Sequence, residues 1–255
     1  MTIRSLVLAS HLALGLAALG GNSAAAQQFN SDNYLSKPAG VATIILTYGE
    51  RSNIVMTTFS LLPRWEFTTA LYKVNADDDP NTDDGYSMSL YFKYMLFENA
   101  AKTGGVAFKA GTGLDPGYLS SVGVEDAFRT YWVNAPVTFP FFGNKVSLDL
   151  MPGASYTKDY GEEEEGAWAF TYSTRLAVYP ASPKWALVGE VFGGEGEVTT
   201  IPEYKVGLRL EPNPYATFAL TYGQEFAGTN GARLEIGMML FTPSFFCISG
   251  CKVPK

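Results

Sequence analysis

Eleven charged residues share one positional feature: each is expected on the small, polar side of a stretch in which polar and apolar residues alternate. Seven are basic and four are acidic, and they are Arg64, Glu66, Lys93, Lys109, Asp149, Arg175, Glu190, Lys205, Arg209, Arg233 and Glu235. Opposite charges on one face can pair into a salt-bridge network, or they can form a charged constriction that selects solutes. Because the same residues serve both chemistries, both interpretations stay open. The basic majority predicts that any selectivity favours anions.

Catalytic and cofactor chemistry is largely excluded by what the chain lacks. The only histidine, His11, lies in an N-terminal segment that we expect to be removed. A mature chain without histidine has no Ser-His hydrolase mechanism and no histidine-ligated metal site. The Gly-rich stretches GTGLDPG and GGEGE are not followed by helical patterns, so they do not predict phosphate-binding loops. We therefore expect no enzyme, no catalytic residues, no cofactor and no metal. An enzyme would need a carboxylate-only or Ser-Lys mechanism, for which no candidate pair is found.

The N-terminal segment has the three parts of a secretory signal peptide. Arg4 supplies a positive charge, residues 6–19 form an apolar run, and Ala24 to Ala26 provide a small-residue cleavage site. The interpretation is a signal peptide over residues 1–26, followed by a periplasmic segment over 27–40. The alternative is an N-terminal anchor helix. The formal net charge of the full sequence is −7, and removal of Arg4 with this segment changes it to −8.

The elements that position the charged residues are β-strands. In GYSMSLYFKYMLF, residues 85–97, the even positions from 86 to 96 are aromatic or aliphatic, and the odd positions carry hydroxyls, Met95 and the cation Lys93. This period of two is typical of a strand with different surroundings on its two faces. About twelve such runs are expected, at 41–48, 53–61, 64–74, 86–97, 105–113, 127–139, 145–156, 167–179, 184–193, 203–211, 214–223 and 232–241.

The connections between these runs alternate in length from the second onward. Short ones such as LLP, PFFGN and EPNP contain Pro, Asn and Gly, whereas long ones such as NADDDPNTDDG and KDYGEEEEG are acidic. If neighbouring strands are antiparallel, the long loops emerge at one end and the short turns at the other. This is the layout of an outer-membrane barrel with short periplasmic turns.

Three observations predict that the apolar face points outward, toward lipid. A barrel of about eight strands is just filled by side chains, so twelve strands leave a wider, wet interior. The polar faces are small, rich in Ser, Thr, Gly and Ala. Aromatic residues flank the apolar faces, as in the girdles at bilayer interfaces; they are Trp65, Tyr86, Trp168, Tyr204 and Tyr215 near strand starts and Phe97, Phe139, Tyr156 and Tyr222 near strand ends. The predicted fold is all-β: a closed, antiparallel, up-and-down transmembrane β-barrel over residues 41–242.

With its signal peptide, alternating strands, Pro/Gly turns and the strand LEIGMMLF near the end, the chain resembles small bacterial outer-membrane β-barrel proteins. These include the family named for a phenol-degradation meta-pathway operon. The resemblance implies an outer-membrane location in a Gram-negative bacterium and a porin-like channel or uptake protein for small solutes. The alternative is a structural or adhesive barrel whose lumen is closed by salt bridges. A soluble, secreted β protein is a further alternative.

The end of the chain departs from the barrel pattern. Such barrels usually stop at an aromatic residue that ends the last strand, whereas this chain continues past Phe241 with TPSFFCISGCKVPK. Phe241 also falls on the face assigned to the lumen. Residues 243–255 are therefore expected to form a C-terminal tail, in which Cys247 and Cys251 could close a local disulfide in the oxidising periplasm.

The expected partners follow from the membrane location. They are outer-membrane lipid, lipopolysaccharide and small solutes, with no nucleic acid, and the oligomeric state is left open. The acidic loops offer hard oxygen ligands, so Ca²⁺ or the cations that bridge lipopolysaccharide could bind there. NADDDPNTDDG lacks the ordered spacing of a calcium loop, and a solvated acidic surface is the simpler interpretation.

Overall fold

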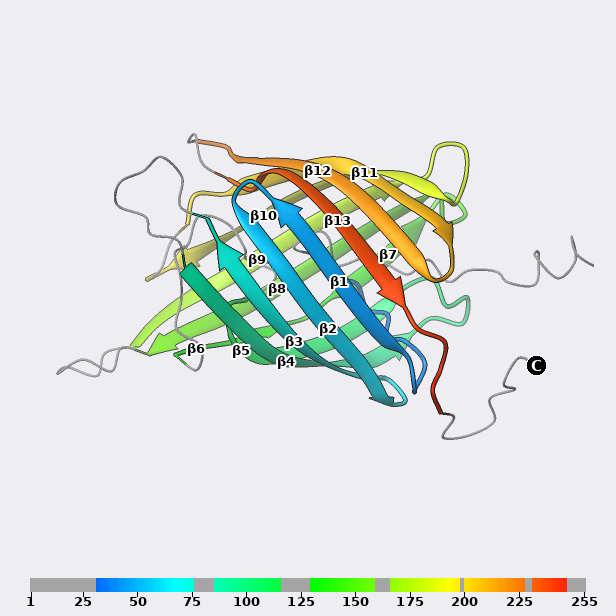
Figure 1. Ribbon diagram of the computed structural model, residues 1–255, viewed down its shortest axis with the longest axis horizontal. Coiled ribbons are helices and arrows are strands. Elements are labelled where there is room, and N and C mark those ends of the chain that lie inside the picture. The colour runs from blue at the N-terminus through cyan, green and yellow to red at the C-terminus, as the bar shows by residue number, and fades with distance from the viewer. Residues whose placement is uncertain are drawn as a thin grey trace, which may run out of the picture.

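The computed structural model describes residues 31–75, 85–115, 129–158, 166–197, 200–227 and 231–246. In these ranges the chain forms thirteen β-strands and no helix (Figure 1). The strands are β1 (Ala42–Gly49), β2 (Ser52–Leu62), β3 (Trp65–Val74), β4 (Gly85–Glu98), β5 (Gly105–Gly113), β6 (Thr130–Asn134), β7 (Val137–Phe141), β8 (Val146–Lys158), β9 (Gly166–Val178), β10 (Trp185–Gly196), β11 (Glu203–Asn213), β12 (Ala216–Glu225) and β13 (Arg233–Phe241).

The strands form one closed antiparallel barrel. Apart from β6 and β7, strands that are consecutive in the chain pair with each other, and β1 also pairs with β13 along Thr43↔Phe241 to Gly49↔Glu235, which closes the sheet. The halves β6 and β7 both pair with β5 on one side and β8 on the other, so together they fill one position. The barrel therefore has twelve strand positions. The predicted fold class is confirmed.

The interruption between β6 and β7 has a local cause. Ala135 and Pro136 separate the two halves, and Pro136 has no backbone N–H to donate to the ladder. Its carbonyl still accepts from the N–H of Ala107 at 2.8 Å, and the N–H of Ala135 donates to the Pro152 carbonyl at 2.9 Å. The single run expected at 127–139 is thus a strand broken by proline, and its first residues, 127 and 128, lie outside the described residues.

The two faces of the wall have opposite exposure. On β3, Leu71 is 60% exposed while its neighbour Ala70 is 1% exposed, and the alternation continues along the strand. The outer face carries Leu, Val, Ile and Phe, and the buried inner face carries mostly Thr, Ser, Ala and charged residues. Closure of the barrel satisfies the backbone hydrogen bonds within the sheet, and the apolar exterior suits contact with lipid. The predicted orientation is confirmed, with Lys93 inside.

Aromatic side chains form two rims on the outer face. One rim lies at the end where β2 and β3 meet, which we call the short-turn end, and includes Phe97 and Tyr215. The other lies at the opposite, long-loop end and includes Tyr86 and Trp168. Trp168 packs on Tyr156 with ring centroids 4.6 Å apart. Rims of this kind suit the two bilayer interfaces.

Within the described residues, no helix is long and apolar enough to cross a membrane.

Residues 31–37, which precede β1, lie inside the barrel. Residues 27–40 were expected outside it, in the periplasm, but Ser31, Asp32, Asn33 and Tyr34 are all buried. The chain reaches β1 at the short-turn end, where the Gly40 N–H donates to the Ser60 carbonyl at 2.7 Å. We call residues 31–37 the inner segment. A stretch without periodic pattern gave no sign of this position, because its partners lie on strands far along the chain.

Candidate functional site in the barrel lumen

Nine of the eleven charged residues singled out by the alternation are buried on the inner face. They are Glu66, Lys93, Lys109, Asp149, Arg175, Glu190, Lys205, Arg209 and Glu235, and none is more than 6% exposed. Charges this deeply buried need partners, because desolvation otherwise costs several kcal/mol for each ion. We therefore describe these luminal charges together with the opposite charges that they contact.

The other two predicted residues lie elsewhere. Arg64 is exposed in the turn between β2 and β3, with a φ of 70°, so its assignment to the lumen is wrong. The strand was expected to begin at 64 but begins at Trp65, and a turn residue does not follow strand alternation. Arg233 begins β13 at the long-loop end and is half-buried, on the inward parity but at the rim.

A row of alternating charge crosses four adjacent strands, β8 to β11. Asp149 lies opposite Arg175, Arg175 opposite Glu190, and Glu190 opposite Lys205. Arg175 donates from Nε and from one terminal nitrogen to Asp149 Oδ2, at 3.0 and 2.7 Å. At the far end of the row, Lys205 pairs with Glu235 at 2.9 Å. Opposite charges directly across antiparallel strands stabilise the sheet, so this row stiffens one part of the wall.

A second charged group lies on β3, β4 and β5 and contains a like-charge contact. Glu66 lies opposite Lys93, and their charged groups are 2.8 Å apart. Lys93 in turn lies opposite Lys109. Asp32 of the inner segment lies between the two lysines, with its Oδ2 3.4 Å from Lys93 Nζ and 3.3 Å from Lys109 Nζ. The inner segment thus supplies the carboxylate that the wall lacks.

Ser31 ties the inner segment to the other charged row. Its N–H donates to a Glu190 carboxylate oxygen and its hydroxyl contacts that of Ser173. Its carbonyl accepts from Arg175 at 2.8 Å. Consecutive residues, Ser31 and Asp32, therefore contact two parts of the wall that are separated by β6, β7 and β8. The inner segment bridges the lumen.

The remaining contacts of the inner segment continue toward the short-turn end. The Tyr34 N–H donates to Thr138 Oγ1 at 3.3 Å, and the Lys37 N–H donates to Glu66 Oε1 at 2.7 Å. The Lys37 ammonium lies 4.0 Å from the centre of the Phe241 ring. Phe241 is buried, as its parity predicts.

Two titratable groups of the inner segment report its surroundings. Burial alone would raise the pKa of Asp32, but Lys93 and Lys109 outweigh it together with Arg175 and the Asn33 N–H, and the pKa falls to about 2. Burial lowers the pKa of Lys37 to about 8, against the opposing influence of Glu66. Asp32 is therefore an ionised acceptor in the docked segment at neutral pH.

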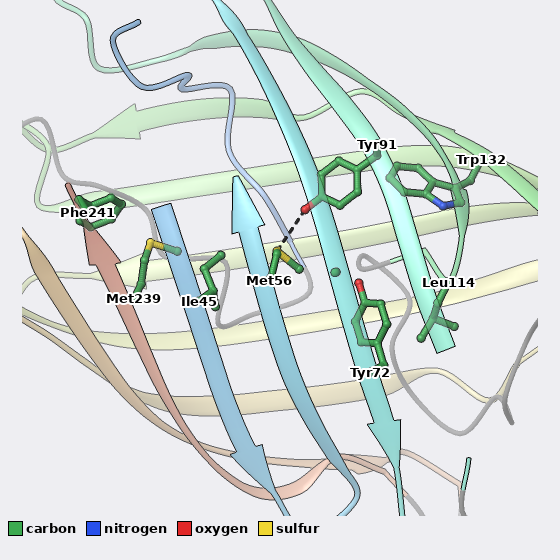
Figure 2. Close-up of a cluster of buried hydrophobic side chains, with 9 residues drawn as sticks. Ile45, Met56, Tyr72, Tyr91, Leu114, Trp132, Met239 and Phe241 are labelled. Carbon is green, nitrogen blue, oxygen red and sulfur yellow. Dashed lines mark hydrogen bonds between the residues drawn. The ribbon is translucent and has the colours of Figure 1, made fainter. Parts of the chain in front are cut away.

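One part of the lumen is apolar, which the sequence analysis did not predict. Figure 2 shows a buried cluster that extends from β13 across β1 and β2 to β6, with Tyr91 and Trp132 at one side and Phe241 at the other. The Tyr91 hydroxyl donates to the Met56 sulfur at 3.2 Å. The signal was present in the inward parity of Tyr91 and Met239, but a mostly small and polar face outweighed it.

Two cavities flank the inner segment. One of about 200 Å³ lies between this segment and the wall and is lined by Tyr34, Thr138, Asp149 and Arg209 among others. The second, of about 30 Å³, has room for about one water and touches Asp32, Glu66 and Lys93. In the described part of the structure the inner segment thus divides the lumen.

Three acidic residues on β11 and β12 were missed. Glu203 and Glu225 are buried and lie opposite each other, and Glu211 pairs with Arg209 at 3.0 Å. Glu203 has the parity of Lys205 and was detectable from alternation. Glu211 has the parity of Arg209 and is the last residue of the run expected at 203–211, so it was detectable in the same way.

Several sequence-based expectations fall on residues outside the described ranges. These are the signal peptide over 1–26, the acidic stretches at 76–84 and 159–165, and Cys247 and Cys251. The disulfide and divalent-cation binding stay predictions. Within the described residues, no group of three or more His, Cys, Asp or Glu side chains could hold a metal ion.

Comparison with known proteins finds neither a matching family model nor a matching curated sequence. Among solved structures, the KdgM porin is 8% identical, with a TM-score of 0.53, over 78% of this chain and 98% of the porin. An outer-membrane channel from Pseudomonas putida F1 is 14% identical over 82% and 98% of the two chains, with a TM-score of 0.49, and the NanC porin is 9% identical over 79% and 97%, with 0.46. The KdgM likeness shows the fold, whereas the phenol-degradation family is not shown. Together with the apolar outer face, this fold is that of an outer-membrane β-barrel.

Proposed function

We propose that the protein is an outer-membrane channel for small solutes and that its inner segment closes the lumen in the state described here. The observation that carries the proposal is that the residues across the lumen belong to the inner segment and not to the barrel wall. Ser31 and Asp32 bridge two parts of the wall, and both belong to a segment that takes no part in the barrel ladder.

The wall around the inner segment supports a path once that segment leaves. Many inner positions are small, including Thr43, Thr58, Ser89, Ala107 and Ser173. Twelve strands enclose a wider interior than the eight that side chains just fill. Removal of residues 31–37 from such a barrel would leave a water-accessible passage lined by the charged rows.

A structural or adhesive barrel with a permanently blocked lumen is the second candidate. It is favoured by the pairing of the luminal charges, since Arg175, Lys205 and Arg209 each pair with a carboxylate of the wall. In that case the inner segment is a fixed part of the interior. The two candidates differ in whether residues 31–37 ever leave the lumen.

Weak anion preference is retained as part of the proposal, in a more local form. Across the described strands the buried set has five basic residues (Lys93, Lys109, Arg175, Lys205, Arg209) and six acidic ones (Glu66, Asp149, Glu190, Glu203, Glu225, Glu235). Glu203 and Glu225 lie beyond Lys205 toward the long-loop end. Around the inner segment, these five cations face the other four anions and Glu211, which pairs with Arg209, so the wall charges balance there. Departure of Asp32 removes one further negative charge and shifts the lumen toward anions.

Planar-bilayer recordings of the mature full-length chain test the channel proposal. We expect infrequent openings above background in the wild type, because the inner segment is docked most of the time. A variant whose docking is weakened should open more often. If pure, folded wild type and docking-weakened variants all give no steps above background, the blocked-barrel candidate is correct.

A further inference from the structure

We propose that Lys93 and Lys109 form a binding site for an organic carboxylate with an apolar body, which Asp32 occupies in the closed state. The inference deepens the proposed function by naming a class of solute, and it rests on that function only for the route by which the solute arrives. Its geometry is independent of whether the barrel conducts.

The lysine pair is an incomplete arrangement of the wall. Lys93 and Lys109 lie directly opposite each other on β4 and β5, and like charges in that position destabilise a sheet. Glu66 neutralises Lys93, but the wall provides no ion pair to Lys109 among the described residues. The site therefore requires an anion that does not belong to the wall.

Lys109 has bonding capacity that Asp32 leaves unused. Its side chain is fully buried, and within the described residues its ammonium makes the 3.3 Å ion pair with Asp32 but no hydrogen bond. An ammonium carries three donors. A free carboxylate, unlike one tethered to the chain, can orient both oxygens toward Lys109 and Lys93 and gain charge-assisted hydrogen bonds there.

The groups beside the lysine pair specify the rest of the ligand. Lys109 Nζ lies 4.8 Å from the Tyr91 ring centre and 5.8 Å from that of Trp132. Both rings belong to the buried apolar cluster, where Figure 2 shows Met56 on β2, Tyr72 on β3 and Leu114 just after β5. A ligand with its carboxylate at the lysines would place its apolar body against these side chains. Burial of that apolar body adds affinity in proportion to the apolar area removed from water. A small hydrophilic anion lacks that contribution.

Competition with Asp32 couples ligand binding to the inner segment. Because the two carboxylates share one position, an organic acid binds only when Asp32 has left. Its measured affinity is therefore its intrinsic affinity multiplied by the fraction of molecules in which Asp32 is undocked. The same competition means that the ligand promotes release of residues 31–37. The solute would therefore favour opening of its own path.

Calorimetric titration of the mature full-length chain in detergent micelles tests the site, with hexanoate as the probe. Asp32→Ala should bind hexanoate at least about tenfold more tightly than the wild type, because the competing carboxylate is gone. Hexanamide, which has the same apolar body without the charge, should not bind, and Asp32→Ala/Lys109→Met should lose hexanoate binding. Equal heats for hexanoate and hexanamide, or binding unchanged by Lys109→Met, would overturn the proposal.

A second measurement does not depend on the folding of Asp32→Ala. Ser31 is buried against Ser173, so in a chain with Ser31→Cys and both tail cysteines changed to Ser the new thiol should react slowly with a maleimide. Hexanoate should increase its labelling rate several-fold and hexanamide should not; equal rates with both would contradict the site. Bilayer recordings separate the two proposals, since hexanoate binding without conductance refutes only the channel, and conductance without binding refutes only the site.

Discussion

Lys93 and Lys109 lie directly opposite each other across β4 and β5, and Asp32 holds both ammonium groups within 3.4 Å of one carboxylate oxygen. Two buried cations in register are tolerated only with such an anion. Since this anion belongs to the inner segment and not to the barrel wall, neutralisation of the two lysines depends on the inner segment being docked. A change that weakens the ion pairs of Asp32 should therefore also favour opening of the lumen.

Asp32→Asn should open the lumen. The substitution keeps the size of the side chain but removes the charge between the lysines, and loss of one partner of a buried ion pair costs about 3–5 kcal/mol. The docked segment should therefore be populated at least about a hundredfold less relative to the released one. Single-channel recordings should show a higher open probability.

The matched control for this substitution is Asn33→Ala. Among the described residues, the hydrogen bond of the Asn33 side chain is local, accepted from the Leu35 N–H at 3.2 Å. Its loss should leave the open probability near the wild-type value. An equal increase in both variants would assign the effect to general loosening of the segment.

Acid should release the inner segment. The pKa of docked Asp32 is about 2, whereas that of a free aspartate is 3.8. A depressed pKa in the docked state means that docking is fully stabilised above pH 3.8 and is weakened as the pH falls from there toward 2. Open probability should rise across this window in the wild type. Glu66 also faces Lys93, so the comparison is with Asp32→Asn, whose open probability should depend less on pH over the same range.

Asp149→Asn should destabilise the barrel. Asp149 accepts two hydrogen bonds from Arg175 and one from the Thr138 hydroxyl at 2.6 Å. Its neutralisation leaves a buried guanidinium with weaker partners, and the free energy of unfolding should fall by about 3 kcal/mol. Urea titration of protein in lipid vesicles measures the change. Thr138→Val, which removes one hydroxyl donor, should lower the free energy of unfolding by about 1 kcal/mol. Equal losses in both variants would show that the ion pair contributes no more than a neutral hydrogen bond.

Arg209→Ser with Arg233→Ser should shift ion selectivity toward cations in a channel opened by Asp32→Asn. Arg209 is buried and paired with Glu211, so its removal both deletes a cation and leaves that carboxylate uncompensated. The reversal potential under a salt gradient reports the shift. Lys184→Ser, in the exposed turn before β10, is the control and should leave it unchanged. An unmoved reversal potential in the double variant would exclude these side chains from the conducting path.

Alternation along the chain predicted the barrel, its orientation and nine of the luminal charges, because a closed sheet between lipid and water imposes a period of two on every strand. Alternation assigns no face to a residue that lies outside a strand. Arg64 was misplaced since the strand begins one residue later, whereas Glu203 and Glu211 have the inward parity of Lys205 and Arg209 and could have been found by it. Pro136 divides a strand without changing the number of positions around the barrel.

The inner segment could not be predicted from the sequence. Its position depends on Asp32 reaching Lys93 and Lys109 and on Ser31 reaching Arg175, contacts that join residues far apart in the chain. No local pattern in residues 27–40 indicates such partners. The inward charges counted from the sequence also lacked Asp32. Without it the two lysines indicated an excess of cations, whereas in the structure Asp32 pairs with both of them.

The most direct test of the central claim, that residues 31–37 close the lumen, is to tether them. Ser31 and Ser173 have hydroxyls in contact, so cysteines at these positions are close enough to form a disulfide. The measurement is single-channel conductance of Asp32→Asn carrying Ser31→Cys and Ser173→Cys, with both tail cysteines changed to Ser. We predict background conductance under oxidising conditions and frequent openings after reduction. Openings of the same frequency in the oxidised, cross-linked protein would show that the segment does not close the path.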